Sequence, residues 1–386
     1  MMEKRFEPDF VLFAVTLALL GIGTIMVYSA SVPIAEKKFG SSSFFLWRHA
    51  VRVLLGLVVM FITARMDYHA WGKLSLPFLF VAFLLLVWLL VPGLPFTSEG
   101  IRGAKSWLKW RAFTLQPSEV AKLALVIYLA DGLARRQHQV HRFAKGFLPP
   151  FVILCTGCGL ILLQPDLGMA ATISVIGMVL LFVGRAKMRH MVAVGLAMVS
   201  ALGTLVYHSS YWWQKLVALL NPGLDPQGVG YHAGQSLISL GSGGLWGLGL
   251  GQGRQKLLYL PEAHTDFVFS VIGEELGFMG TMVVMALFLL LLWRGVRAAR
   301  SAPDLFGFLL ALGISFMIFG LALIHIGVVS AVLPTTGLPL PLVSYGGSSI
   351  LLTLAGVGIL LNISKQAGWK RVEGRDMRTR LKTLYR

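Results

Sequence analysis

Charged residues are scarce in this sequence. Only 13% of its 386 residues are Asp, Glu, Lys or Arg, whereas 56% are hydrophobic, and the mean hydropathy is +0.74. Soluble globular proteins carry roughly a quarter charged residues, so this composition excludes a soluble globular fold. Apolar runs long enough to cross a bilayer recur along nearly the whole chain, which indicates a polytopic membrane protein.

Cysteines are almost absent. Cys155 and Cys158 are the only two, and both fall inside one apolar run, so no disulfide bond can link the outer loops. Their C-x-x-C spacing would suit a redox site only in an accessible, electropositive setting. The apolar neighbours favour a packing role instead.

Several catalytic motifs are missing as well. The chain has no G-x-x-x-x-G-K-[ST] for ATP hydrolysis and no D-x-D, the usual metal clamp of sugar-nucleotide transferases. It has no H-E-x-x-H or Cys/His cluster for zinc, and no G-x-S-x-G nucleophile elbow. What is left is a site made of carboxylates and basic groups.

The apolar runs predict an all-α polytopic membrane protein with about ten transmembrane helices. The predicted spans are about 10–30, 48–64, 74–92, 117–133, 147–163, 168–184, 190–208, 267–293, 305–330 and 347–363. The first run lacks a clear small-residue cleavage site, so it is interpreted as a retained helix and not as a signal peptide.

Basic residues outnumber acidic ones by 34 to 17, giving a net charge of +17. Most of them fall in the head, short loops and tail that this layout places on the side of the N-terminus. The positive-inside rule therefore predicts that both termini are cytoplasmic. The excess of base is a topology signal, with some attraction to anionic membrane lipids, and does not indicate a nucleic-acid partner.

The chain is predicted to form one transmembrane domain over residues 1–364 and a basic cytoplasmic tail over 365–386. A long extracytoplasmic loop, about 209–266, separates helices 7 and 8. Within it, seven of the thirteen residues from Gly241 to Gly253 are glycine, which disfavours a helix. Two alternatives stay open for this stretch: a flexible loop, or backbone that lies close to a ligand or the membrane surface.

Four predicted helices share a feature at their outer ends, where each begins with proline and polar groups. The segments read "LQPSEVAK", "LQPDLG", "LPEAHTD" and "LPLVSYGGSS". Proline and an acid in the first turn are ordinary helix starts when each helix is taken singly. Taken together, the four ends can converge on one polar cavity, which in a membrane bundle marks a site or pathway. The polar residues concerned are Gln116, Ser118, Glu119, Lys122, Asp166, Glu262, His264, Asp266, Ser344 and Tyr345.

Within the fourth helix, Glu119 and Lys122 are three residues apart and share a face. A buried ion pair and direct substrate contact are both compatible with that spacing. A set of outer basic residues could meet a phosphate on a lipid-borne substrate. The set comprises Arg102, Lys105, Lys109, Arg111, Lys122, Arg254 and Lys256.

In the eighth predicted helix, Asp266 heads a narrow stripe at helical spacing. The stripe continues through Ser270, Gly273 and Gly277. It would allow either helix packing or room for a substrate. Glu274 and Glu275 are adjacent, so they are expected not to face the same groove, and at least one is expected to make structural hydrogen bonds.

Several long segments resemble the FtsW/RodA/SpoVE (SEDS) family, the peptidoglycan glycan polymerases of bacteria. They include "GAKSWLKW", "FTLQPSEVAKLALVIYLA", "QPDLG", "GYHAGQSLISLGSGGLWGLGLGQGRQKLLYLPEAHTDFVFSVIGEELG" and "LPTTGLPLPLVSYGGSSIL". "YLPEAHTDF" and the last segment look more like FtsW, the division branch, than RodA, the elongation branch. The chain departs from the family pattern at Leu115, where phenylalanine is usual, and at His232, where glutamine is frequent.

The resemblance implies polymerisation of lipid II on the outer face of the bacterial cytoplasmic (inner) membrane during cell division. Asp266 matches the family's essential acid and would act as general base on the acceptor 4-hydroxyl, with undecaprenyl pyrophosphate as the leaving group. The predicted substrate-binding residues are Gln116, Ser118, Glu119, Lys122, Asp166, Lys256, Glu262, His264, Arg102, Arg111 and Tyr345.

The resemblance also implies a class B penicillin-binding protein, which is a transpeptidase, and other divisome proteins as partners. A divalent cation, Mg²⁺ or Mn²⁺, could help to neutralise the leaving pyrophosphate, as could basic side chains or helix ends. Three alternatives stay open: an elongation polymerase of the RodA type with the same chemistry, a lipid II flippase, and a scaffold without activity. A flippase would place its key polar groups near the bilayer midplane.

Overall fold

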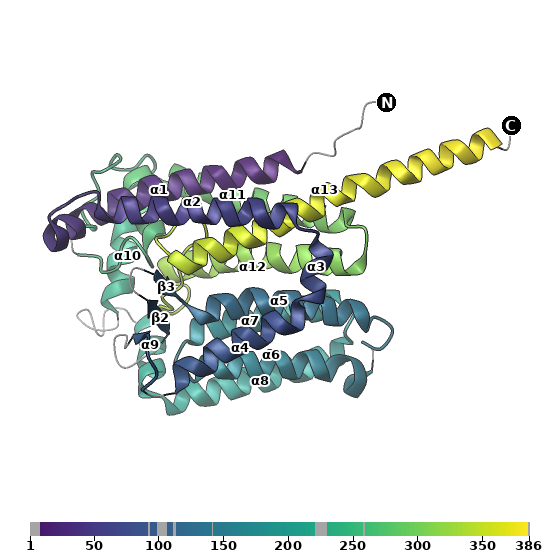
Figure 1. The fold of residues 1–386 in the computed structure, drawn as a ribbon. Coiled ribbons are helices and arrows are strands. Elements are labelled where there is room, and N and C mark those ends of the chain that lie inside the picture. Colours follow the sequence, from purple (N-terminus) through teal and green to yellow (C-terminus); the bar gives the residue numbers. More distant parts are fainter. Residues whose placement is uncertain are drawn as a thin grey trace.

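The computed structural model describes residues 8–91, 93–98, 106–110, 113–140, 142–220, 230–257 and 259–384. They form a bundle of long, roughly aligned helices (Figure 1). The first half contains α1 Phe10–Phe39, α2 Phe44–Arg65, α3 Tyr68–Lys73, α4 Ser75–Leu90, β1 Thr97–Ser98, β2 Trp107–Trp110, β3 Phe113–Leu115, α5 Pro117–Arg135 and α6 Leu148–Leu162. The second half contains α7 Leu167–Val183, α8 Met188–His208, α9 Ser210–Leu220, α10 Tyr231–Ser242, α11 Val268–Ser301, α12 Leu305–Val329 and α13 Gly347–Leu384. A π-helical turn, η2 Phe143–Phe147, leads into α6.

Each of the ten ranges that hydropathy predicted lies mostly within a helix. By length and composition, seven helical stretches among the described residues could cross a membrane: α1, α2, η2 with α6, α8, α11, α12 and the first part of α13. α4 and α7 are apolar but shorter. α5 is not among the seven, because it carries Glu119, Lys122 and Asp131 in its 19 residues. The chain is therefore a mostly helical, multi-pass membrane protein.

The structure differs from the prediction in three places. α1 continues nine residues past the predicted end, until Gly40 adopts a left-handed conformation (φ 65°) and caps it. The segment 209–266, predicted to be one extracytoplasmic loop, contains two helices, α9 and α10. The segment before α5 contains a small antiparallel sheet in the order β1-β2-β3, which an all-α fold does not include.

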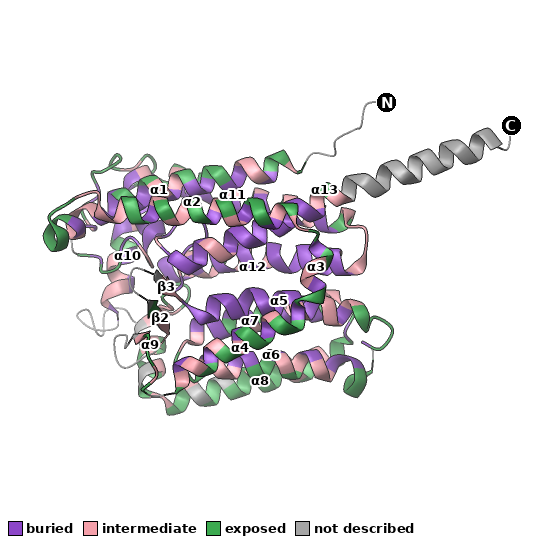
Figure 2. Ribbon diagram, viewed as in Figure 1, coloured by how far each residue is buried: buried purple, intermediate pink, exposed green. Residues whose placement is uncertain are grey.

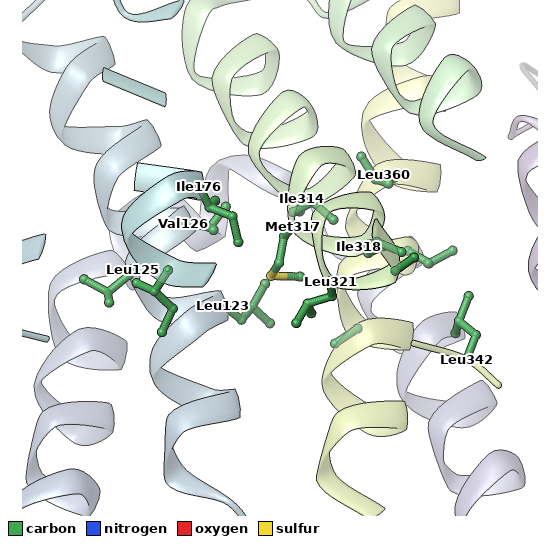
Figure 3. Packing of buried hydrophobic residues seen from close by; sticks show 14 of the residues in the cluster. Leu123, Leu125, Val126, Ile176, Ile314, Met317, Ile318, Leu321, Leu342 and Leu360 are labelled. Carbon is green, nitrogen blue, oxygen red and sulfur yellow. The ribbon is translucent and has the colours of Figure 1, made fainter. Parts of the chain in front are cut away.

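Four helices form the centre of the bundle. α5 is buried along nearly its whole length, and α7, α12 and the first part of α13 pack around it (Figure 2). Figure 3 shows the contact zone, where Leu123 and Val126 of α5 approach Met317 of α12. The outward faces of α2, α4 and α8 carry exposed apolar side chains, as expected for surfaces that meet lipid.

α11 is interrupted near its N-terminal end. Gly277 has φ 68° and ψ −168°, which only glycine adopts easily, and the α-helical hydrogen bonds break there. The glycine-rich segment fills the break. Leu248 N–H donates to Glu274 O (2.9 Å), and Phe278 N–H donates to Gly244 O (2.9 Å). The segment is therefore packed on α11 and is not a flexible loop, and the other alternative, backbone close to a ligand or the membrane surface, stays a prediction.

The side chains of Glu274 and Glu275 hold the same segment. Glu274 Oε1 accepts the Arg254 N–H (2.7 Å), and Glu275 Oε2 accepts the Gly251 N–H (3.0 Å). Both are buried. The expectation that two adjacent acids cannot face one groove is wrong, because the segment wraps around the interrupted turn and meets both. The expected structural hydrogen bonding is confirmed for both.

Candidate functional site

Asp266 lies in a turn immediately before α11, and α11 begins at the end of the bundle where α5 and α13 also begin (Figure 1). The turn starts at Glu262, whose φ of 53° is unusual for a residue other than glycine, and the Asp266 N–H donates to Glu262 O (3.1 Å). Across from it lies Gly337 in the α12–α13 connection. A Cβ on Gly337 would be 3.4 Å from Asp266 Oδ2, so the backbone approaches the carboxylate closely.

The pKa of Asp266 is raised to about 7. Burial is the main cause, because it disfavours the charged form, and the negative charge of Glu262 adds to the effect. The positive charge of Lys215 works in the opposite direction. A carboxylate with a pKa near neutrality is well matched to accept a proton at physiological pH.

Asp166 lies near Asp266 at the start of α7. Its Oδ1 accepts the Met169 N–H (3.0 Å), so it caps the helix as the sequence suggested. Burial raises its pKa to about 6, and the charge of Glu119 contributes in the same direction. The charge of Asp166 also raises the pKa of Asp266, so the starts of α5, α7 and α11 share one electrostatic environment.

Glu119 and Lys122 form an ion pair in the first two turns of α5. Lys122 Nζ lies 2.7 Å from Glu119 Oε2, and each side chain is only 1% exposed. The pair that the sequence allowed is thus present. Glu119 Oε1 and the neighbouring Ser118 Oγ are buried and have no hydrogen-bond partner among the residues that the structure describes, and the same holds for Thr336 Oγ1 beside α7. Buried polar atoms are usually satisfied, so water or a ligand group is expected at these atoms.

Lys215 is a site residue that the sequence did not single out. It lies on α9, donates from Nζ to Thr335 O (2.7 Å), and lowers the pKa of both Asp166 and Asp266 through its charge. The available signal was its place in "SSYWWQKL", an amphipathic stretch of the outer segment with two tryptophans suited to the membrane interface.

His264 and Tyr345 form a second part of the site. The Tyr345 N–H donates to His264 O (3.0 Å), and their rings lie 5.5 Å apart with the ring of Phe45 against both. The Arg52 guanidinium lies over the Tyr345 ring, 4.6 Å from its centroid. Burial lowers the pKa of His264, which favours the neutral imidazole.

A groove of about 280 Å³ opens beside Arg52. It is lined by Trp47, Arg48, Val51, Arg52, Leu55, Thr114, Gly347 and Leu351. The lining includes two guanidinium groups, of Arg48 and Arg52, and apolar side chains of α2 and α13. The groove therefore combines sites for an anionic group and for a hydrocarbon chain, close to the His264–Tyr345 pair.

Lys256 and Gln116 are buried in structural contacts. Lys256 Nζ lies 2.6 Å from Glu275 Oε1 and 2.8 Å from Ser29 Oγ, which joins the glycine-rich segment to α1. The Gln116 N–H donates to Ser348 Oγ (3.2 Å), which joins the start of α5 to α13. Arg102 and Arg111 lie outside the described residues. The substrate-binding roles of all these residues stay predictions.

No group of three or more His, Cys, Asp or Glu side chains suited to hold a metal ion occurs within the described ranges. Asp166 and Asp266 do not by themselves supply a ligand set for the divalent cation that the resemblance left open.

Comparisons with known proteins agree on one family. Residues 10–368 match the model of the FtsW/RodA/SpoVE cell cycle protein family. The chain is 42% identical over 370 residues to the probable peptidoglycan glycosyltransferase FtsW of Trichlorobacter lovleyi, covering 96% of each chain. It is 43% identical to the stage V sporulation protein E of Bacillus subtilis, covering 95% of this chain and 99% of that one.

Solved structures are similar as well. A chain from a study of the structural coordination of polymerization and crosslinking by a peptidoglycan synthase complex has a TM-score of 0.77 and 30% identity, covering 93% of this chain and 98% of that chain. The rod shape determining protein RodA of Thermus thermophilus has a TM-score of 0.68 and 30% identity, covering 93% and 97%.

Proposed function

The chain belongs to the FtsW/RodA/SpoVE family, and from that premise we propose that it is a peptidoglycan glycosyltransferase that polymerises lipid II. The reaction takes place at the outer face of the cytoplasmic membrane, with both termini and the basic tail in the cytoplasm. Several relatives at about 42% identity bear the FtsW name, which supports a role in division. A class B penicillin-binding protein is proposed as partner, since a similar chain belongs to a peptidoglycan synthase complex.

The observation that carries the proposal is the setting of Asp266. It is a half-buried carboxylate with a pKa of about 7, influenced by the charges of Glu262 and Lys215, at the end of the bundle where four helices begin. That setting suits a general base for a hydroxyl nucleophile.

In the proposed step, Asp266 takes the proton from the 4-hydroxyl of the acceptor sugar. The oxygen forms a bond to the anomeric carbon of the donor, and the bond from that carbon to undecaprenyl pyrophosphate breaks. The departing pyrophosphate carries negative charge, so it needs charge neutralisation more than protonation. Lys215 and the groove arginines Arg48 and Arg52 are the proposed cationic groups. A single displacement on an α-linked donor gives a β-linked glycan.

The flippase alternative has less support. A transporter of this kind would place its key polar groups near the midplane of the helices. Here Glu119 and Lys122 lie in the first two turns of α5, and Asp166 and Asp266 precede α7 and α11, so the polar groups gather at one end.

The direct test is a polymerisation assay with purified full-length protein and labelled lipid II, with and without a class B partner and with and without Mg²⁺. We expect glycan polymer resolved by gel electrophoresis. A parallel assay follows transfer of labelled lipid II between the leaflets of vesicles. Transfer of lipid II between leaflets without any polymer, under all conditions, would replace the glycosyltransferase with a flippase. If neither transfer nor polymer is detected, the scaffold alternative would stand.

The pKa of Asp266 predicts a rising pH dependence. Below about pH 7 the carboxyl is protonated and cannot accept a proton, so kcat/KM should rise through that pH. Glu262→Gln removes a charge that raises this pKa, so the rising limb should move to lower pH by on the order of one unit. Lys215→Met removes a charge that lowers the pKa of Asp266, so the rising limb of this variant should move to higher pH. An identical limb in wild type and both variants would contradict Asp266 as the base.

A further inference from the structure

A second cavity lies at the opposite end of the bundle from Asp266, between α3, α4, α5 and α6. Its volume is about 370 Å³. The lining residues are Gly72, Lys73, Ser75, Leu76, Pro77, Tyr128, Asp131, Gly132, Arg135, Arg136 and Pro150. The cavity reaches the backbone of α5, because a Cβ on Gly132 would meet no atom within 4 Å.

The cavity carries a net positive charge. Its one acid, Asp131, is already engaged: Oδ1 accepts from Arg135 Nε (2.8 Å) and Oδ2 accepts from Ser75 Oγ (3.0 Å). Lys73 and Arg136 form no ion pair with any side chain in the described part of the structure. Two exposed cations are therefore left facing one cavity.

The apolar side of the cavity continues onto the surface that faces lipid. Leu76 lines the cavity and is 63% exposed, and Phe80 (67%) and Leu84 (48%) follow at four-residue steps along the outward face of α4. These spacings place the three side chains in one row on the helix. A molecule that fills the cavity with an anionic head can lay a hydrocarbon chain along this row.

We propose that this cavity binds the headgroup of an anionic phospholipid, with the phosphate at Lys73 and Arg136 and one acyl chain along Leu76, Phe80 and Leu84. Basic pockets between membrane helices bind such headgroups. Cations at the C-terminal ends of α3 and α5 also interact favourably with the helix dipoles. That role explains why the cations are there, but it does not explain a cavity that connects them to a row of exposed apolar side chains. The site is independent of the proposed glycosyltransferase activity.

The test uses full-length protein in a neutral detergent and measures the melting temperature with added phosphatidylglycerol, cardiolipin, phosphatidylcholine or inorganic phosphate. Native mass spectrometry counts bound lipids in parallel. We expect the anionic lipids to raise the melting temperature by several degrees and to remain bound, whereas phosphatidylcholine and inorganic phosphate should not.

Two variants locate the site. Lys73→Gln with Arg136→Gln should lose more than half of the lipid-dependent shift, and Gly132→Leu should do the same without changing charge, because leucine fills the cavity and suits a helix better than glycine. The matched control is Arg297→Gln with Arg300→Gln, which removes two exposed charges from the same end of the bundle on α11 and should keep the shift. Equal losses in the two charge variants, or an unchanged shift in Gly132→Leu, would overturn the proposal, as would an equal shift with phosphatidylcholine or with phosphate alone.

Discussion

Asp266→Asn should leave a folded protein that makes no detectable glycan polymer. Asparagine keeps the size of the side chain but cannot accept the acceptor's proton, and loss of a general base lowers the rate by about 10²- to 10⁴-fold. The measurement is the gel assay with labelled lipid II, at equal protein concentration and with the class B partner present.

The stability of the same variant provides an internal check. The folded pKa of Asp266 is raised above its ordinary value, so the native state binds the proton more tightly than the unfolded state, and stability falls as pH rises from about 4 through about 7. A neutral side chain removes this penalty, so Asp266→Asn should melt no lower than wild type at pH 8. The control is Glu36→Gln, which neutralises an exposed carboxylate near the end of α1 and should keep full activity. Full polymer from Asp266→Asn would exclude it as base and direct attention to Glu119 and Asp166.

Breaking the Glu119–Lys122 pair should give the largest loss of stability. Lys122→Met leaves the Glu119 carboxylate buried without its cation, which costs about 3–5 kcal/mol. Glu119→Gln leaves a buried ammonium and should cost a similar amount. The double variant removes both charges and should recover most of the loss, since a buried pair is often neutral relative to uncharged side chains. Thermal and denaturant unfolding of all four proteins form the double-mutant cycle.

The same cycle separates the two roles left open by the sequence. If the pair only holds α5 in place, the double variant should be stable and should polymerise lipid II. If the pair also contacts substrate, the double variant should be stable with a raised KM or no polymer. If the double variant loses as much stability as the two single variants together, the two residues are not coupled and the pair is contradicted.

The helices were predictable because hydrophobic runs need no tertiary information. Their ends were less so. α1 passes its predicted end at 30 because "ASVPIAEKKF" tolerates a helix, and only Gly40 ends it. The interruption of α11 at Gly277 was not predictable, because a glycine in an apolar run also suits close helix packing. What distinguishes it is the glycine-rich segment that replaces the missing backbone hydrogen bonds.

The family was predictable from its long motifs, and the comparisons confirm it. The grouping of helix starts also anticipated that Asp166 and Asp266 share an environment. Lys215 was missed because nothing local to α9 shows that it reaches the α12–α13 connection, more than a hundred residues later. For the same reason the sequence could not show that Lys256 joins Glu275 and Ser29, which are far apart along the chain.

Two hydrogen bonds at the end of the bundle near Asp266 join segments that are far apart along the chain. The Gln116 N–H donates to Ser348 Oγ, and the Tyr345 N–H donates to the carbonyl of His264, two residues before Asp266. A nascent chain that lacks α13 and the connection before it lacks a partner for each of these groups. The arrangement of helix starts around Asp266 is therefore complete only after the last part of the chain has folded onto the rest, so we expect a chain truncated before Tyr345 to make no polymer.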